Sequence, residues 1–172
     1  VRNVEIGFVF QSFNLLPKLS ALDNVALPLL YRGVKKEERR KLAKEALETV
    51  GLSERVDYRP DQLSGGQCQR VAIARAIVGK PKLLLADEPT GALDSKAAKE
   101  LLKLFTDLNQ DGQTIVMVTH SVKAASTAGR VLFIKDGKVF HQLYKGNLSE
   151  VEMYQKISDA MTAITAGGEI DE

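Results

Sequence analysis

The sequence predicts an α/β protein whose mostly parallel sheet is flanked by helices. Three short, continuous apolar runs carry this prediction, at residues 83–86, 114–118 and 131–134. Helical patterns separate the runs, and apolar strands that alternate with helices are typical of a parallel sheet covered on both faces. Size and composition agree with this class, because 172 residues amount to about one domain. A chain that is 44% hydrophobic and 27% charged is neither disordered nor collagen-like.

Before the first of these runs, the pattern predicts one strand, three helices and a loop. Residues 6–10 combine apolar, β-branched and aromatic side chains, which is typical of a buried strand. Gly51 ends the second helix, Pro60 interrupts the chain within the loop, and Ser64 begins the third helix. The helices are expected at residues 20–30, 35–50 and 64–78, and the loop at residues 53–63.

Three further helices and a hairpin are expected in the second half of the chain. Asp136-Gly137 predicts a tight turn that joins the third apolar run to a strand at residues 138–143. Ser149 is expected to cap the last helix. The apolar residues of that helix, at spacings of three and four, are Val151, Tyr154, Ile157, Met161 and Ile164. The other helices are expected at residues 95–109 and 121–127, and fraying is expected at residues 167–172.

Charge and cysteine content exclude several classes of function. The 24 Lys and Arg residues are interleaved with 22 Asp and Glu residues, so a nucleic-acid partner is not expected. Cys68 is the single cysteine, which excludes an internal disulfide framework and a metal site built from several cysteines. No run reaches the ~18 apolar residues of a membrane span.

The stretch Leu-Ser-Gly-Gly-Gln at residues 63–67 is the most informative part of the chain. Two adjacent glycines at a helix start are costly as structure alone, because each loses extra backbone entropy on folding. They suit a backbone that touches a ligand, since the N–H groups and partial positive charge of a helix N-terminus attract phosphate. The structural alternative is a capping box of Ser64 and Gln67, which leaves Gly65 and Gly66 unexplained.

An acidic pair follows the apolar run at residues 83–86. Asp87 and Glu88 are therefore expected at the carboxyl edge of the sheet, where α/β folds bind ligands. One carboxylate can hold Mg²⁺, and the other can polarise an attacking water. The alternative is a pair of ordinary solvated acids at a turn.

Three single residues are weaker candidates. Gln11 follows a predicted strand and could ligate Mg²⁺ or its water, or be a plain loop amide. His120 follows another strand, where an imidazole can reach a γ-phosphate, although a lone histidine is more often a surface residue. Asp94 has a strong structural alternative as the N-cap of the helix at residues 95–109.

Together these motifs have the order and spacing of ABC transporter ATPase domains, and the chain resembles that family over residues 4–144. The matching stretches are residues 63–76 for the signature motif and its helix, 83–88 for the Walker B strand and 89–94 for the D-loop. Residues 10–17 and 87–91 are most similar to the exporters of macrolides, lipoproteins and antimicrobial peptides.

The resemblance implies a P-loop NTPase-like fold with a small α-helical subdomain that carries the signature motif. The expected parts are a partial RecA-like ATPase core at residues 1–13 and 81–148, the helical subdomain at 14–80, and a C-terminal helix and tail at 149–172. The resemblance also implies a cytoplasmic protein, peripheral on the inner face of the cell membrane, whose partner is a transmembrane permease.

The resemblance further implies that two copies sandwich two ATP molecules, each with Mg²⁺. Glu88 is then the general base for water, and His120 is the switch histidine. Gln11 and Asp87 contact the Mg²⁺, and Gln11 also couples to the permease. The other residues expected at the shared nucleotide site are Ser64, Gly65, Gly66, Gln67 and Asp94. Cys68 stands where the family commonly has a long polar residue, and no role is expected for it.

One part of the family pattern is missing. A phosphate loop needs Gly-x-x-x-x-Gly-Lys followed by Ser or Thr, and neither Gly-Lys pair, at residues 79–80 and 137–138, is followed by either residue. We therefore expect the C-terminal two-thirds of an ATPase domain, which alone binds ATP weakly and hydrolyses it negligibly. A sheet without its first strands is also expected to expose an edge and to self-associate.

Two other functions compete with that of a transport ATPase. A chromosome-organising ATPase would insert a long coiled coil between Gln11 and Ser64, which are only 53 positions apart. A non-catalytic fragment that docks a permease would use the helical region at residues 14–50. Its candidate contact residues, for which core packing is the alternative, are Phe13, Leu15, Leu16 and Leu19.

Overall fold

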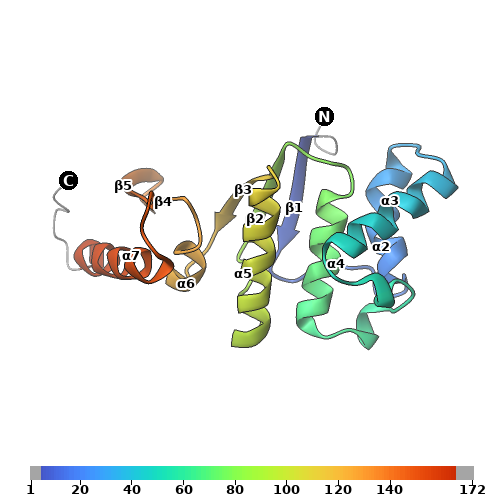
Figure 1. Ribbon diagram of the computed structural model, residues 1–172, viewed down its shortest axis with the longest axis horizontal. Coiled ribbons are helices and arrows are strands. Elements are labelled where there is room, and N and C mark those ends of the chain that lie inside the picture. The colour runs from blue at the N-terminus through green and yellow to red at the C-terminus, as the bar shows by residue number, and fades with distance from the viewer. Residues whose placement is uncertain (1–4, 166–172) are drawn as a thin grey trace. The chain divides into compact units, whose positions relative to one another are not determined.

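The computed structural model describes residues 5–165 (Figure 1). The chain divides after Val118 into two compact units. Unit 1 carries the parallel sheet, and unit 2, which begins at Thr119, carries a hairpin and the last helix. No helix among the described residues is long and apolar enough to cross a membrane. The finer division into an ATPase core and a helical subdomain at residues 14–80 stays a prediction.

The sheet of unit 1 consists of three parallel strands in the order β1-β2-β3. They are β1 (Ile6–Phe10), β2 (Leu83–Asp87) and β3 (Thr114–Val118), which confirms the three predicted strands to within one residue. The last residues of the strands are paired, Phe10 with Asp87 and Asp87 with Val118. The carboxyl ends of all three strands therefore form one level edge.

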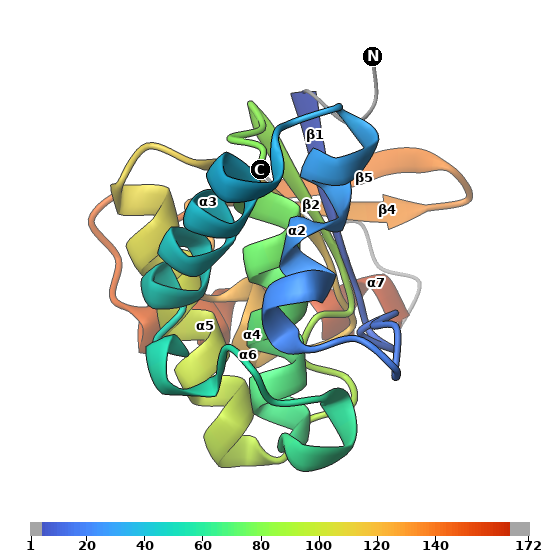
Figure 2. The same cartoon turned by 90° about the vertical axis from the view of Figure 1, so that its right-hand side faces the viewer.

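The helices of unit 1 agree with the prediction, and the predicted loop contains two 3-10 turns. Their bounds are α2 (Ala21–Tyr31), α3 (Lys36–Thr49), η1 (Ser53–Arg55), η2 (Pro60–Gln62), α4 (Gly65–Ile77) and α5 (Ser95–Gln110). α4 contacts β1, α5 contacts β3 and α4, and α2 and α3 pack on each other and on α4 (Figure 2). Gly51 ends α3 with a φ of +73°, a conformation that favours glycine. Short helices thus fill the interval between Gln11 and Ser64, and no coiled coil is inserted there.

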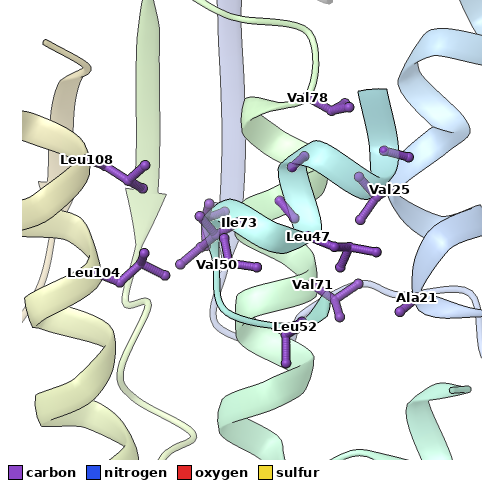
Figure 3. Close-up of a cluster of buried hydrophobic side chains, with 14 of the residues drawn as sticks. Ala21, Val25, Leu47, Val50, Leu52, Val71, Ile73, Val78, Leu104 and Leu108 are labelled. Atoms are coloured by element: carbon purple, nitrogen blue, oxygen red, sulfur yellow. The ribbon is translucent and has the colours of Figure 1, made fainter. Parts of the chain in front are cut away.

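The core of unit 1 is built around α4 (Figure 3). Residues 71–74 of this helix are all buried, because other elements cover it on several sides. Val9 and Leu84 reach the same cluster from the sheet, and Val25 and Leu47 reach it from α2 and α3. Burial of a side chain of this size is worth roughly 1.5–3 kcal/mol. The packing on α4 therefore holds the sheet and the other helices in one unit.

Within unit 1, the helices that pack on the sheet lie on one of its faces, and helical cover of the other face stays a prediction. Side chains alternate between the faces along each strand, and α4 and α5 both pack on the face that carries Val9 and Leu84. The exposed apolar side chains of the opposite face are Phe8, Phe10, Val116 and Val118. The sequence pattern could not reveal this, since apolar residues occupy both faces. Self-association through the edge strands stays a prediction.

Unit 2 consists of α6 (Val122–Ala125), β4 (Arg130–Lys135), β5 (Lys138–Tyr144) and α7 (Glu150–Thr165). β4 and β5 form the predicted antiparallel hairpin. Asp136 and Gly137 in its turn have φ values of +52° and +75°, as a two-residue hairpin turn requires. β4 pairs with β5 alone within the described residues, so the expectation that the third apolar run joins the parallel sheet is wrong. Because the turn at Asp136 and Gly137 is tight, the next strand, β5, runs antiparallel to β4 and pairs with it.

The last helix has its predicted cap and a shifted buried face. Ser149 Oγ accepts a hydrogen bond from the amide of Glu152, whose carboxylate accepts from the Ser149 amide at 2.8 Å. The buried side chains are Met153, Ile157 and Ala160. Of the predicted stripe, the exposed residues are Val151, Tyr154 and Met161. Two apolar series share α7, and the packing within unit 2, which includes α6, selects one of them. Residues 167–172 lie outside the described residues.

Candidate functional site

The acidic pair lies at the carboxyl edge of the sheet, where the sequence places it. Asp87 is the last residue of β2, and its side chain is exposed. Glu88 follows with a φ of +43°, and its N–H donates to the Val118 carbonyl at 2.9 Å. A non-glycine residue in this conformation is strained and persists only where its surroundings fix it. The chain therefore turns sharply between the two carboxylates.

Gln11 adjoins the turn that follows Glu88. It comes directly after β1 and is exposed. The Gly91 amide donates to the Glu88 carbonyl at 3.0 Å and closes the turn. A Cβ at Gly91 would lie 2.7 Å from the Gln11 Nε2 atom, so the Gln11 side chain lies directly against this glycine. The structure thus brings Gln11 close to Asp87 and Glu88, from which it is far apart in the sequence.

The signature stretch forms the predicted capping box at the start of α4. Ser64 Oγ accepts from the Gln67 amide at 3.3 Å, and Gln67 Oε1 accepts from the Ser64 amide at 2.9 Å. The structural alternative for Ser64 and Gln67 is therefore confirmed. The amides of Gly65 and Gly66 donate to no atom of residues 5–165, and Gly65 is exposed. Two N–H groups at a helix N-terminus are left open to an anion.

The two glycines also have a packing role that the sequence analysis missed. A Cβ at Gly66 would lie 3.0 Å from the Cβ of Ala97 in the first turn of α5. A Cβ at Gly65 would lie 3.6 Å from a methyl carbon of Leu93 and 3.8 Å from the ring of Phe13. The start of α4 therefore approaches the residues after Glu88 and the loop after β1.

Asp94 is the N-cap of α5. Its carboxylate accepts hydrogen bonds from the amides of Lys96 and Ala97, both at 2.9 Å. The Ala97 bond is the main reason why the pKa of Asp94 is lowered from its ordinary value. The structural alternative is confirmed, and a further role at a dimer interface stays a prediction.

His120 belongs to unit 2. It borders an open cavity of about 240 Å³ that Ile134 of β4 and Met161 of α7 also line. The neighbouring Ser121 caps α6 by accepting from the Ala124 amide at 3.2 Å. The predicted contact of His120 with a γ-phosphate stays a prediction.

A family model described as ABC transporter matches residues 1–91, which is more than half of the chain. The chain belongs to the ABC transporter family. An uncharacterised ABC transporter ATP-binding protein of Bacillus subtilis, YvrO, is 58% identical over 139 residues, which make up 81% of this chain and 61% of that protein. The macrolide export ATP-binding/permease protein MacB 2 of Yersinia pestis is 50% identical over 81% of this chain and 20% of its own length.

A solved ABC transporter structure resembles this chain in fold. It is the dimeric, post-hydrolysis state of the ATP-binding cassette MJ0796 bound to ADP and Pi, and MJ0796 comes from Methanocaldococcus jannaschii. The TM-score is 0.72 at 46% sequence identity, over 86% of this chain and 65% of that one. The α/β fold with its parallel sheet is thus that of an ABC cassette. The chain spans about three-fifths of the length of relatives such as YvrO.

Two side chains of this ABC transporter chain extend from α4 to the site, and the sequence did not predict either of them. Gln69 is buried, and its Nε2 donates to the carbonyls of Phe10 and Pro89. Arg75 donates to the carbonyls of Phe13 and Asn14, and its burial lowers its pKa. The available signal was weak: Gln69 lies four residues before buried Ile73, on the apolar face of the helix.

Cys68 is a buried thiol beside these residues. It lies 3.5 Å from the Pro60 carbonyl, and burial raises its pKa. A raised pKa leaves less of the reactive thiolate at neutral pH. The expectation that Cys68 has no role stays a prediction.

Proposed function

We propose that this chain is the part of a transporter ATPase that carries the water-activating carboxylates and the signature helix. The reaction is ATP hydrolysis, coupled to export through a membrane permease. The observation that carries the proposal is the cluster at the sheet edge, where Gln11, Asp87 and Glu88 lie together in unit 1. The family and the relatives named for macrolide export support this assignment.

Glu88 is the general base in this proposal, and Gln11 and Asp87 hold the Mg²⁺. Amide and carboxylate oxygens suit this hard cation. The described residues contain no group of three His, Cys, Asp or Glu side chains that could hold a metal by themselves. The donor set fits Mg²⁺ all the same, because this ion is usually bound through one or two carboxylates together with water and phosphate oxygens. The ion would neutralise charge on the phosphates, while Glu88 accepts a proton from the attacking water.

The open amides at the start of α4 complete the proposed site in trans. Ser64, Gly65 and Gly66 would contact the γ-phosphate of an ATP held by a second copy of the protein, with Gln67 supporting Ser64. The unpaired amides and the positive end of the helix suit this anion. The dimeric state of the MJ0796 cassette supports two copies facing each other. Asp94, at the cap of α5, would then lie at the dimer interface.

The remaining parts of the proposal concern His120, the permease and location. His120 would act as the switch histidine that contacts the γ-phosphate. The name of MacB 2, an ATP-binding and permease protein, supports a permease as the proposed partner of this chain. The chain would accordingly lie on the cytoplasmic face of the cell membrane, bound to that permease.

Phosphate release with Mg-ATP tests the proposal. The 172-residue chain alone should hydrolyse ATP negligibly, because it has no Gly-x-x-x-x-Gly-Lys motif to bind the β- and γ-phosphates. An ATPase subunit in which this chain is joined to a segment with that phosphate-loop motif should release phosphate from ATP at a steady rate. If the chain alone hydrolyses ATP at ordinary ATPase rates, and Glu88→Gln abolishes this hydrolysis, the expectation that the chain alone is inactive is wrong. A subunit with its phosphate loop that fails to hydrolyse ATP would contradict the function.

Exposure of Leu16 favours a second candidate, a non-catalytic fragment that docks a permease. Leu16 is 47% exposed, whereas Phe13, Leu15 and Leu19 are half-buried and fit the packing alternative. A permease pull-down with Leu16→Asp separates the candidates. Loss of capture with no change in the hydrolysis of the completed subunit assigns docking to Leu16. Unchanged capture removes Leu16 from the contact.

A further inference from the structure

Gln69 is a buried amide side chain between two segments of the candidate site. It is fully buried on α4, a few residues after the signature glycines. Its Nε2 donates to the Phe10 carbonyl at 3.1 Å and to the Pro89 carbonyl at 2.8 Å. These carbonyls stand directly before Gln11 and directly after Glu88. One side chain therefore joins the two segments that carry the proposed metal ligand and the proposed base.

The chemistry of this position suits a primary amide. Both N–H groups of Nε2 are used, and a carboxylate in its place would face two carbonyl oxygens without a donor. Oε1 of Gln69 is buried without a hydrogen-bond partner among residues 5–165, which lowers stability. An unbranched apolar side chain would fill the same space without that penalty. The hydrogen bonds to the two carbonyls, and not packing, therefore explain why an amide side chain stands at position 69.

The segments that α4 holds have backbone conformations that need support. Glu88 has a φ of +43°, and Phe13 and Asn14 have φ values of +59° and +50°. Such residues persist where the surrounding structure fixes them. Arg75, farther along the same helix, donates to the Phe13 carbonyl at 2.9 Å and to the Asn14 carbonyl at 2.5 Å. Gln69 and Arg75 thus hold the first residues of the loop after β1, Gln69 at Phe10 and Arg75 at Phe13 and Asn14.

We propose that Gln69 is a positioning residue that fixes Gln11 and Glu88 relative to the signature glycines at the start of α4. The inference rests on the proposed function. The hydrogen bonds join α4 to main-chain carbonyls, so a shift of the helix start passes directly to both segments. When phosphate binds at Gly65 and Gly66, a shift of the helix start therefore changes the positions of Gln11 and Glu88 in the same protomer.

Hydrogen exchange of the 172-residue chain tests the positioning directly. Gln69→Met removes both donors and the unpaired acceptor while keeping an unbranched side chain. We expect the Phe13, Asn14 and Gly91 amides to exchange at least tenfold faster, because their short turns lose support. The buried amides of residues 71–74 should stay within threefold. Unchanged exchange in both segments overturns the proposal.

Two further variants separate this effect from general loosening. Arg75→Lys leaves one ammonium group for two carbonyls, and should speed exchange at Phe13 and Asn14 but not at Gly91. Gln110→Met removes an exposed amide at the end of α5 and should change neither segment. An Arg75→Lys variant that also releases Gly91 contradicts the specific role of Gln69.

Steady-state kinetics of the ATPase subunit with its phosphate loop supplies the functional readout. Gln69→Met should lower kcat at least tenfold and change KM less than threefold, because no nucleotide contact is removed. A lower kcat accompanied by a higher KM and a lower melting temperature, or no change in kcat, overturns the proposal. If the unsubstituted subunit hydrolyses no ATP, the proposed function fails, and the exchange measurement still decides whether Gln69 holds the two segments.

Discussion

Gly91 leaves the space that the side chain of Gln11 occupies, since a Cβ at position 91 would lie 2.7 Å from Gln11 Nε2. The contact joins the residue after β1 to the turn after β2. It places an amide beside the turn that follows the acidic pair, although Gln11 and Glu88 are separated in the sequence by most of unit 1. A glycine is needed here for close approach, since its φ is not positive.

We predict that Gly91→Ala displaces the Gln11 side chain with little effect on the fold. The blocked atom is the end of a flexible side chain, so the free energy of unfolding should fall by less than about 1 kcal/mol. Mg²⁺-dependent ATP affinity of the ATPase subunit with its phosphate loop should fall at least tenfold. Gly129→Ala is the matched control, because no other described part of the chain comes within 4 Å of its Cβ position. Equal Mg²⁺ dependence in both variants would show that Gln11 does not contact the ion.

Gly7→Ala should have the opposite profile, a large loss of stability. A Cβ at Gly7 would overlap the Ala76 carbonyl group, which belongs to the backbone of α4 and cannot rotate away. β1 and α4 would have to separate, and overpacking of this kind costs about 1–3 kcal/mol or more. Denaturant unfolding measures the change against Gly129→Ala. A Gly7→Ala protein as stable as that control would mean that β1 does not pack this closely on α4.

The agreement between sequence and structure is best where the signal is local. Continuous apolar runs predicted β1, β2 and β3, and capping residues predicted the starts of the helices after Ser64 and Asp94, because those signals lie within each element. The face on which α4 and α5 pack and the pairing of β4 were not predictable, since they depend on which elements meet. The hydrogen bond of Gln69 to the Phe10 carbonyl, 59 positions away, was not predicted for the same reason.

The cap of α5 gives a pH-dependent prediction. Because the folded-state pKa of Asp94 is lowered, its contribution to stability is present above the unfolded pKa and is lost as pH falls through the folded pKa. Asp94→Ala should therefore lower the melting temperature at pH 7, and this difference should shrink below about pH 4. Asp94→Asn keeps a capping oxygen, so its melting temperature at pH 7 should lie between those of the unsubstituted protein and Asp94→Ala. A constant difference from pH 7 to pH 2 would show that the charge of Asp94 contributes nothing to the cap.

The most direct test of the ATPase assignment is single-site replacement of the proposed base. In the ATPase subunit with its phosphate loop, Glu88→Gln keeps the shape of the side chain and removes the proton acceptor. We expect phosphate release to fall about 10²–10⁴-fold, while Mg-ATP still binds and the melting temperature changes little. Phosphate release at the unsubstituted rate would contradict the account.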